Sequence, residues 1–157
     1  MKNYFNTRLD LENKKDRVEV LEHNIEKANS QLFKITSTLK DTVTNGGKRE
    51  KDKMAKILGD IQKWQDELMD LKEDILYLTP YVEKMEKRVN AMVGAEKEVF
   101  EGFYNTYANK KTGERIRILA NKLNYSSPRI YQILNKVNND LGIKVNKESE
   151  NKHYKKL

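Results

Sequence analysis

An apolar repeat with heptad spacing runs through most of the first 92 residues, and it restricts this part of the chain to long helices. From Leu11 to Leu39 the apolar residues recur at alternating steps of four and three, with Lys14 as the one clear misfit. A second run with the same spacing extends from Met54 to Met92. A stripe this narrow predicts two helices that pack along a single seam, as in a coiled coil.

The sequence Asn45-Gly46-Gly47 interrupts the repeat between the two runs. Because Asn-Gly-Gly is a strong helix stop, we place a turn near residues 44–48 and expect the helices to run antiparallel. The second run keeps its register across Pro80, so we expect a kink or a short break there rather than a change of direction. Residues 1–93 are therefore predicted to form an antiparallel coiled-coil helical hairpin.

Such a hairpin buries little apolar area for each residue that it orders, so we expect it to self-associate as a homodimer. A monomeric hairpin that packs on its own C-terminal domain is the alternative. Four residues off the seam, Val20, Leu58, Met69 and Tyr77, could serve a second contact. The seam residues that we assign to oligomerisation are Val18, Leu21, Ile25, Leu32, Ile35, Leu39, Ile61, Trp64, Leu68, Leu71 and Ile75.

A different pattern, two short helices joined by a tight turn, lies between Gly113 and Leu141. Asn124 tolerates the left-handed backbone that ends a helix, a serine oxygen can cap the next helix, and Pro128 suits a first helical turn. Residues 94–143 are therefore predicted to be a helix-turn-helix DNA-binding domain. Its expected buried residues are Ile116, Leu119, Ala120 and Leu123 in the first helix and Ile130, Ile133, Leu134, Val137 and Leu141 in the second.

A third helix is expected over Ala95–Ala108, after a joint at Gly94. Aromatic residues at helical spacing are more often core than a surface on which bases stack, and we interpret these as core. The residues that we interpret as core are one aliphatic and four aromatic ones, namely Val99, Phe100, Phe103, Tyr104 and Tyr107.

The stretch Leu119–Ile133 resembles the helix-turn-helix in the fourth region of bacterial sigma-70-type factors. Those factors carry a run similar to S-R-V-S-Q-I where this chain has Pro128-Arg129-Ile130-Tyr131-Gln132-Ile133. The stretch is also similar to the ArpU/RinA-type regulators from phages of low-GC Gram-positive bacteria. Asn124 departs from the glycine usual at the turn, and the sequence shows no candidate for a promoter-melting region. The resemblance implies a transcriptional regulator of phage or mobile-element genes rather than a stand-alone sigma factor.

The positive charge of the chain is concentrated in its last part. Residues 1–93 hold 18 Lys and Arg against 17 Asp and Glu, whereas residues 94–157 hold 13 against 7. A polyanion partner explains this location, because contacts with phosphates release counterions and supply most non-specific affinity. A basic surface that only keeps the protein soluble is the alternative.

The second helix is expected to enter the major groove of duplex DNA. There Arg129 would pair with guanine and Gln132 with adenine, while neighbouring polar residues contact bases or phosphates. Basic residues in the preceding loop and helix would hold the DNA backbone. The full predicted set is Ser126, Ser127, Arg129, Tyr131, Gln132, Asn135, Lys136, Lys110, Lys111, Arg115 and Lys122.

The residues that other kinds of chemistry need are scarce in this chain. It has no cysteine, and neither His23 nor His153 has a nearby ligand partner in sequence, so we expect no metal site. We find no nucleophile–base pair and no glycine-rich phosphate loop, so the chain is not expected to be an enzyme or to need a cofactor or a small-molecule substrate. No apolar run suits a signal peptide or a membrane span, and we expect a cytoplasmic protein. Residues 144–157 are interpreted as a polar tail.

Together these patterns predict an all-α protein that acts as a sequence-specific double-stranded DNA-binding transcriptional regulator. RNA polymerase is a candidate further partner. The alternative function is a coiled-coil oligomerisation or adaptor protein, which binds another protein or assembles on DNA as a phage DNA-packaging recognition subunit does. The operator, the direction of regulation and the geometry of the dimer stay open.

Overall fold

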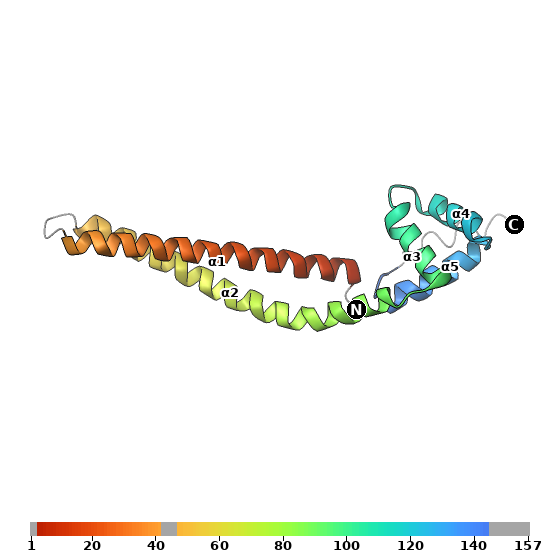
Figure 1. The fold of residues 1–157 in the computed structure, drawn as a ribbon, viewed down its shortest axis with the longest axis horizontal. Coiled ribbons are helices and arrows are strands. Elements are labelled where there is room, and N and C mark those ends of the chain that lie inside the picture. The colour runs from red at the N-terminus through yellow and green to blue at the C-terminus, as the bar shows by residue number, and fades with distance from the viewer. Residues whose placement is uncertain (1–2, 42–46, 145–157) are drawn as a thin grey trace. The chain divides into compact units, whose positions relative to one another are not determined.

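The computed structural model describes residues 3–41 and 47–144, and every regular element in these ranges is a helix (Figure 1). The prediction of an all-α protein is therefore confirmed. The turn expected near residues 44–48 and the polar tail lie largely outside the described residues. The elements are α1 (Tyr4–Asp41), α2 (Gly47–Asn90), α3 (Gly94–Glu101), the π-helix η1 (Gly102–Thr106), α4 (Thr112–Leu123) and α5 (Ser127–Asp140).

The contacts of the backbone divide the chain into two compact units. Unit 1 contains residues 1–8 and 81–157, and unit 2 contains residues 9–80. Both long helices contribute to both units. α2 continues as one helix through Pro80, so the short break that was one of the two expectations there does not occur. The sequence analysis placed its boundary after residue 93 instead. The division differs because residues from both ends of the expected hairpin pack into the core of unit 1.

In unit 2, the helices α1 and α2 run side by side in opposite directions (Figure 1). Arg17 donates two hydrogen bonds, of 2.7 and 3.0 Å, to the carboxylate of Glu67. Later residues of α1 meet earlier residues of α2 in a small core that consists of Ala28, Ile57 and Ile61 with Ile25, Leu32, Ile35 and Trp64 packed against it.

Lys14, the misfit in the apolar seam, lies between two carboxylates of unit 2. Its Nζ is 3.1 Å from an oxygen of Asp74 and 3.5 Å from one of Asp10. The hydrogen bond with Asp74 is the main reason that the pKa of Lys14 is raised above its ordinary value. The charge at this seam position is thus paired rather than left facing apolar side chains.

Unit 1 has a larger core that consists of two clusters. The first cluster joins α3, η1, α4 and α5, and its buried residues are Val99, Phe103, Ile116, Leu119, Ala120, Ile130, Ile133 and Leu134. The second cluster joins the first turn of α1 and the last turns of α2 to α3 and α5, and its buried residues are Tyr4, Met85, Met92, Phe100, Val137 and Leu141.

The first turn of α1 is fixed to the end of α5. The backbone N–H of Tyr4 donates to the carbonyl oxygen of Leu141 over 3.1 Å, and the ring of Phe5 stacks on Phe100 with centroids 6.0 Å apart. Thr7 is buried and donates its hydroxyl to the carbonyl of Asn3. The sequence analysis gave these residues no role.

The helix expected over Ala95–Ala108 is two elements, because regular α-helix gives way to the π-helix η1 at Gly102. The interpretation as core is confirmed for Val99, Phe100 and Phe103, which are buried. Tyr104 and Tyr107 are only partly buried and pack against the first cluster. Gly102 permits this packing. A Cβ atom at this position would overlap the side chain of Leu119, which is fully buried.

Candidate nucleic-acid interface

The joint between α4 and α5 has the backbone that the sequence predicts. Asn124 ends α4 in the left-handed conformation, with φ 55° and ψ 39°. The N–H groups of Asn124 and Tyr125 both donate to the carbonyl oxygen of Ala120, so a carbonyl of the last helical turn is satisfied. Asparagine takes the place of glycine here because its short polar side chain tolerates this conformation.

The start of α5 is capped as expected. The hydroxyl of Ser126 accepts a hydrogen bond of 3.4 Å from the backbone N–H of Arg129, and Pro128 lies in the first turn. Ser126, which was predicted to contact DNA, is therefore also the N-cap residue of α5. The cap fixes the residue at which the helix begins, and with it the direction of the side chains that follow.

The buried face of α5 is the one that its spacing predicts. All five expected residues are at most 8% exposed, namely Ile130, Ile133, Leu134, Val137 and Leu141. The equivalent residues of α4 are also buried, except that Leu123 is only partly so. The orientation of α5 is thus set by apolar contacts along its whole length.

The polar residues assigned to the other face of α5 divide into two groups. Arg129, Gln132 and Lys136 are exposed, and the Nη1 atom of Arg129 donates to Oε1 of Gln132 over 3.2 Å. Ser127, Tyr131 and Asn135 are half-buried, and Tyr131 packs against the first cluster. Arg129 and Gln132 are therefore exposed polar residues of the predicted set that are hydrogen-bonded to each other.

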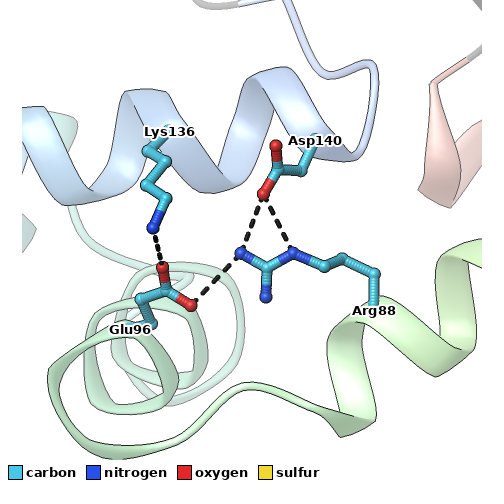
Figure 2. A network of polar contacts seen from close by, with 4 residues as sticks. All are labelled: Arg88, Glu96, Lys136 and Asp140. Carbon is cyan, nitrogen blue, oxygen red and sulfur yellow. Dashed lines mark hydrogen bonds and ion pairs between the residues drawn. The ribbon is translucent and has the colours of Figure 1, made fainter.

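Lys136 belongs to a four-residue network that ties α5 to α3 and to the end of α2 (Figure 2). Its Nζ donates to Glu96 over 2.8 Å, Glu96 accepts from Arg88 over 3.2 Å, and Arg88 also donates to Asp140 over 2.9 Å. The hydrogen bond from Lys136 is the main cause that lowers the pKa of Glu96, followed by the bond from Arg88. The hydrogen bond with Asp140 is the main cause that raises the pKa of Arg88.

Two other predicted phosphate contacts also have acidic neighbours. Lys122 donates to Glu98 over 2.7 Å, and Lys110 donates to Glu114 over 3.2 Å. The bond between Lys122 and Glu98 lowers the pKa of the carboxyl and raises that of the amine. Each of these two lysine amines thus already donates to a carboxylate of the same chain.

Arg115 holds the loop before α4 rather than extending into solvent. Its guanidinium donates to the backbone carbonyls of Phe103, Ala108 and Lys110 and lies 5.0 Å from the centroid of the Phe103 ring. The side chain is half-buried by these contacts. Its neighbour Lys111, immediately before α4, is exposed.

A hydrogen bond inside unit 1 between the half-buried Tyr104 and the buried Asn138 was not predicted. The hydroxyl of Tyr104 donates to Oδ1 of Asn138 over 2.6 Å, and Asn138 is only 2% exposed. Burial is the main reason that the pKa of Tyr104 is raised. In the sequence, an asparagine next to Val137 in a polar stretch gave no sign of burial. The only available signal was its spacing of four residues from the buried Leu134.

A hollow of about 280 Å³ lies beside the exposed face of α5. Its apolar wall includes Val93 and Tyr125, which are 77% and 42% exposed. Arg129, Gln132 and Lys136 also line the hollow. The accessible polar residues of α5 thus border a recess with apolar surface, and neither Val93 nor Tyr125 was among the predicted site residues.

The described residues lack two other features, a membrane-spanning helix and a cluster of metal ligands. Within residues 3–41 and 47–144 no helix has the length and apolar character needed to cross a membrane. The same residues contain no group of three His, Cys, Asp or Glu side chains that could hold a metal ion. Comparison of the chain with protein-family models, with curated proteins and with solved structures finds no match.

Proposed function

We propose that the chain is a sequence-specific double-stranded DNA-binding transcriptional regulator. In this proposal α4, the turn at Asn124 and α5 act as a helix-turn-helix, and residues 9–80 act as an antiparallel coiled-coil hairpin. The observation that carries the proposal is the accessible face of α5. Arg129 and Gln132 are exposed on a helix whose opposite face is buried, so both side chains are presented from a rigid support.

The distribution of charge between the units supports a polyanion partner for unit 1. Unit 1 has 18 Lys and Arg against 9 Asp and Glu, whereas unit 2 has 13 against 15. Since unit 2 carries no positive excess, solubility alone gives no reason for the charge to gather in unit 1. Phosphate contacts give such a reason, because they supply the part of the affinity that does not depend on sequence.

Contacts with bases would come from Arg129 and Gln132 of α5. The planar guanidinium of Arg129 suits the two acceptors of guanine, and the amide of Gln132 suits adenine. Val93 and Tyr125, on the wall of the neighbouring hollow, offer apolar surface of the kind that contacts a thymine methyl group. The proposed recognition surface therefore consists of Arg129 and Gln132 with an apolar border.

Contacts with the DNA backbone would come mainly from Lys111, which is exposed at the start of α4. Arg115 contributes indirectly, because its bonds to three carbonyls keep the preceding loop in one conformation. Lys122 and Lys136 would bind phosphate only by exchanging Glu98 and Glu96 for phosphate oxygens. We therefore expect these two lysines to contribute less than Lys111.

The first test is binding of the full-length protein to a pool of random duplexes, measured by fluorescence anisotropy over a series of salt concentrations. Selection of the bound duplexes then reports any sequence preference. A steep salt dependence together with a recovered motif is the expected result. Absence of binding at low salt would overturn the proposal.

Variants of Arg129 separate charge from base recognition. Arg129→Ala is expected to weaken binding to the preferred site by about 1–3 kcal/mol and to relax the preference at one base pair. Arg129→Lys keeps the charge but cannot form the bidentate hydrogen bonds of a guanidinium. It should therefore retain non-specific affinity for DNA and still lose the preference at that base pair. Lys63→Ala, which removes a positive charge from an exposed position in unit 2, is the control. An unchanged site preference in Arg129→Lys would remove Arg129 from the recognition surface.

The adaptor function remains a second candidate because unit 2 exposes large apolar side chains. Leu58, Met69 and Leu76 on α2 are 53–77% exposed, and such surfaces often mark contacts with other proteins. Binding of the full-length protein to duplexes with steep salt dependence but without any recovered motif would favour this function over the regulator.

A further inference from the structure

The apolar seam of unit 2 is used within one chain. Leu21 is fully buried, and Ile57 and Ile61 are buried in the small core between α1 and α2. The residues that the sequence analysis assigned to oligomerisation thus lie largely in this seam, except for Leu39, whose side chain lies outside the described ones. The buried part of the seam is therefore occupied within the chain, whereas its half-buried residues keep surface that a second copy could cover.

Three exposed apolar residues lie on one face of α2. Leu58, Met69 and Leu76 are 53%, 66% and 77% exposed. They are separated by eleven and seven residues, and at about 100° per residue these spacings bring all three within about 20° of one another around the helix. Gln65 lies on the same side, seven residues after Leu58. These four residues form a stripe along one side of α2.

A groove of about 720 Å³ runs beside this stripe, between α1 and α2 of unit 2. Gln65 and Leu68 form its wall on α2, and Phe33, which is 75% exposed, lies on its wall on α1. The ion pair of 3.0 Å between Lys72 and Glu22, another residue of the groove, joins the two helices on this side. We name the surface formed by Phe33, Leu58, Gln65, Met69 and Leu76 the outer face of unit 2.

The stripe on α2 is symmetric about position 67. Leu58 and Leu76 lie nine residues before and after this position, and Gln65 and Met69 lie two residues before and after it. A second helix in the opposite direction would therefore place its Leu76 against Leu58, and its Gln65 against Met69. A twofold interface requires this reciprocity, in which residue i meets residue j and j meets i.

We propose that the outer face of unit 2 binds the outer face of a second copy of the chain, about a twofold axis level with Glu67. The resulting layer would contain four helices, and it would cover the half-buried Ile25 and Leu68 that line the groove. Unit 2 has 13 positive and 15 negative side chains, so two copies carry no strong mutual repulsion. This proposal does not depend on DNA binding, because it rests on unit 2 alone.

The absence of cysteine from the chain makes a sharp test of the register possible. Full-length variants Leu58→Cys and Leu76→Cys are prepared singly, then treated with a short thiol-specific crosslinker either separately or as an equimolar mixture. The antiparallel register predicts covalent dimers in the mixture and almost none with either variant alone. Dimers from each variant alone, or no dimers in the mixture, would overturn the proposal.

The oligomeric state gives a second, independent test. Sedimentation equilibrium of the full-length protein is expected to show a dimer at micromolar concentration, and Met69→Glu is expected to shift it to a monomer. Met69 is largely exposed, so helix content measured by circular dichroism should stay the same. Val20→Glu, at an exposed position of α1 about 140° around the helix from Phe33, is the matched control and should stay dimeric. A monomeric parent protein, or a dimer that survives Met69→Glu, would contradict the proposed face.

Discussion

The two units of this chain are both helical, but they differ in how completely their helices cover one another. Among the described residues, the eight largest fully buried side chains include only one from unit 2, Leu21, and seven from unit 1. Unit 1 packs segments of five helices around two clusters, whereas unit 2 pairs two helices along a narrow seam. Helix length alone therefore does not supply a core, because each helix of a pair keeps most of its circumference in water.

The largest difference is expected from matched leucine substitutions. Leu134→Ala in unit 1 removes a side chain that is 2% exposed and should lower the free energy of unfolding by about 2–5 kcal/mol. Leu71→Ala in unit 2 removes a half-buried side chain and should cost roughly 1 kcal/mol.

Urea unfolding can measure the two effects separately. Trp64 is the only tryptophan and lies in unit 2, so its fluorescence reports that unit, while circular dichroism reports all helices. Leu134→Ala should shift part of the circular dichroism transition and leave the fluorescence transition nearly unchanged. Equal losses of unfolding free energy in Leu134→Ala and Leu71→Ala would contradict the proposed difference in burial between the two units.

Two glycines should respond to alanine with opposite signs. Gly102→Ala would force a methyl group against the buried Leu119 and should destabilise unit 1 by about 1–3 kcal/mol. Gly59→Ala has nothing within 4 Å of the new methyl group and should stabilise α2 by about 0.5–1 kcal/mol. Thermal unfolding followed by circular dichroism measures both changes. A stabilising Gly102→Ala would show that Leu119 can move aside.

The hydrogen bond between Tyr104 and Asn138 gives a smaller effect in unit 1. Tyr104→Phe removes the hydroxyl that donates to Asn138 over 2.6 Å and should cost about 1–2 kcal/mol, because the amide oxygen stays buried. Tyr125→Phe, at an exposed position of the same unit, is the control and should leave stability nearly unchanged. Urea unfolding compares the two, and a similar small loss in both would argue against a stabilising role for this hydrogen bond.

The smallest expected effect is the pH dependence of the network around Glu96. Hydrogen bonds from Lys136 and then from Arg88 lower the pKa of this carboxyl below its ordinary value of 4.5. Its contribution is therefore complete above pH 4.5 and is lost as the pH falls through the lowered value. We expect about 1 kcal/mol or less, measured as the change in unfolding free energy between pH 6 and pH 3.

A matched pair of variants isolates that contribution. Glu96→Gln should reduce the loss of stability on acidification, whereas Glu73→Gln, at an exposed position of α2 in unit 2, should not. Equal responses would assign the pH dependence to general charge repulsion rather than to the network that Figure 2 shows.

Local features of the fold and of the candidate interface could be predicted from the sequence. The left-handed Asn124, the cap at Ser126 and the buried face of α5 each depend on residues within one or two helical turns. Such features follow from the backbone preferences of single residues and from the spacing of apolar residues. Both can be read from the local sequence without knowledge of distant partners.

Features that depend on distant residues could not be predicted in this way. The contact of Tyr4 with Leu141 and the pairing of Lys136 with Glu96 join segments whose sequences carry no shared pattern. Arg115 is of a residue type that often contacts phosphates. The backbone carbonyls that it binds instead come together only when the loop is folded, so this role could not be predicted. The π-helix was also missed, because the aromatic spacing around Gly102 is compatible with an ordinary helix.

The bond between Tyr4 and Leu141 has a consequence for the time at which unit 1 can be completed. During synthesis, Tyr4 leaves the ribosome well over a hundred residues before its partner. At a synthesis rate of about 5–20 residues per second, on the order of ten seconds pass between the synthesis of Tyr4 and that of Val137 and Leu141, which pack in the same cluster. Both halves of unit 2 are synthesised within that interval. The helix pair can therefore form while the chain is still growing, and the better-covered core is the last to close.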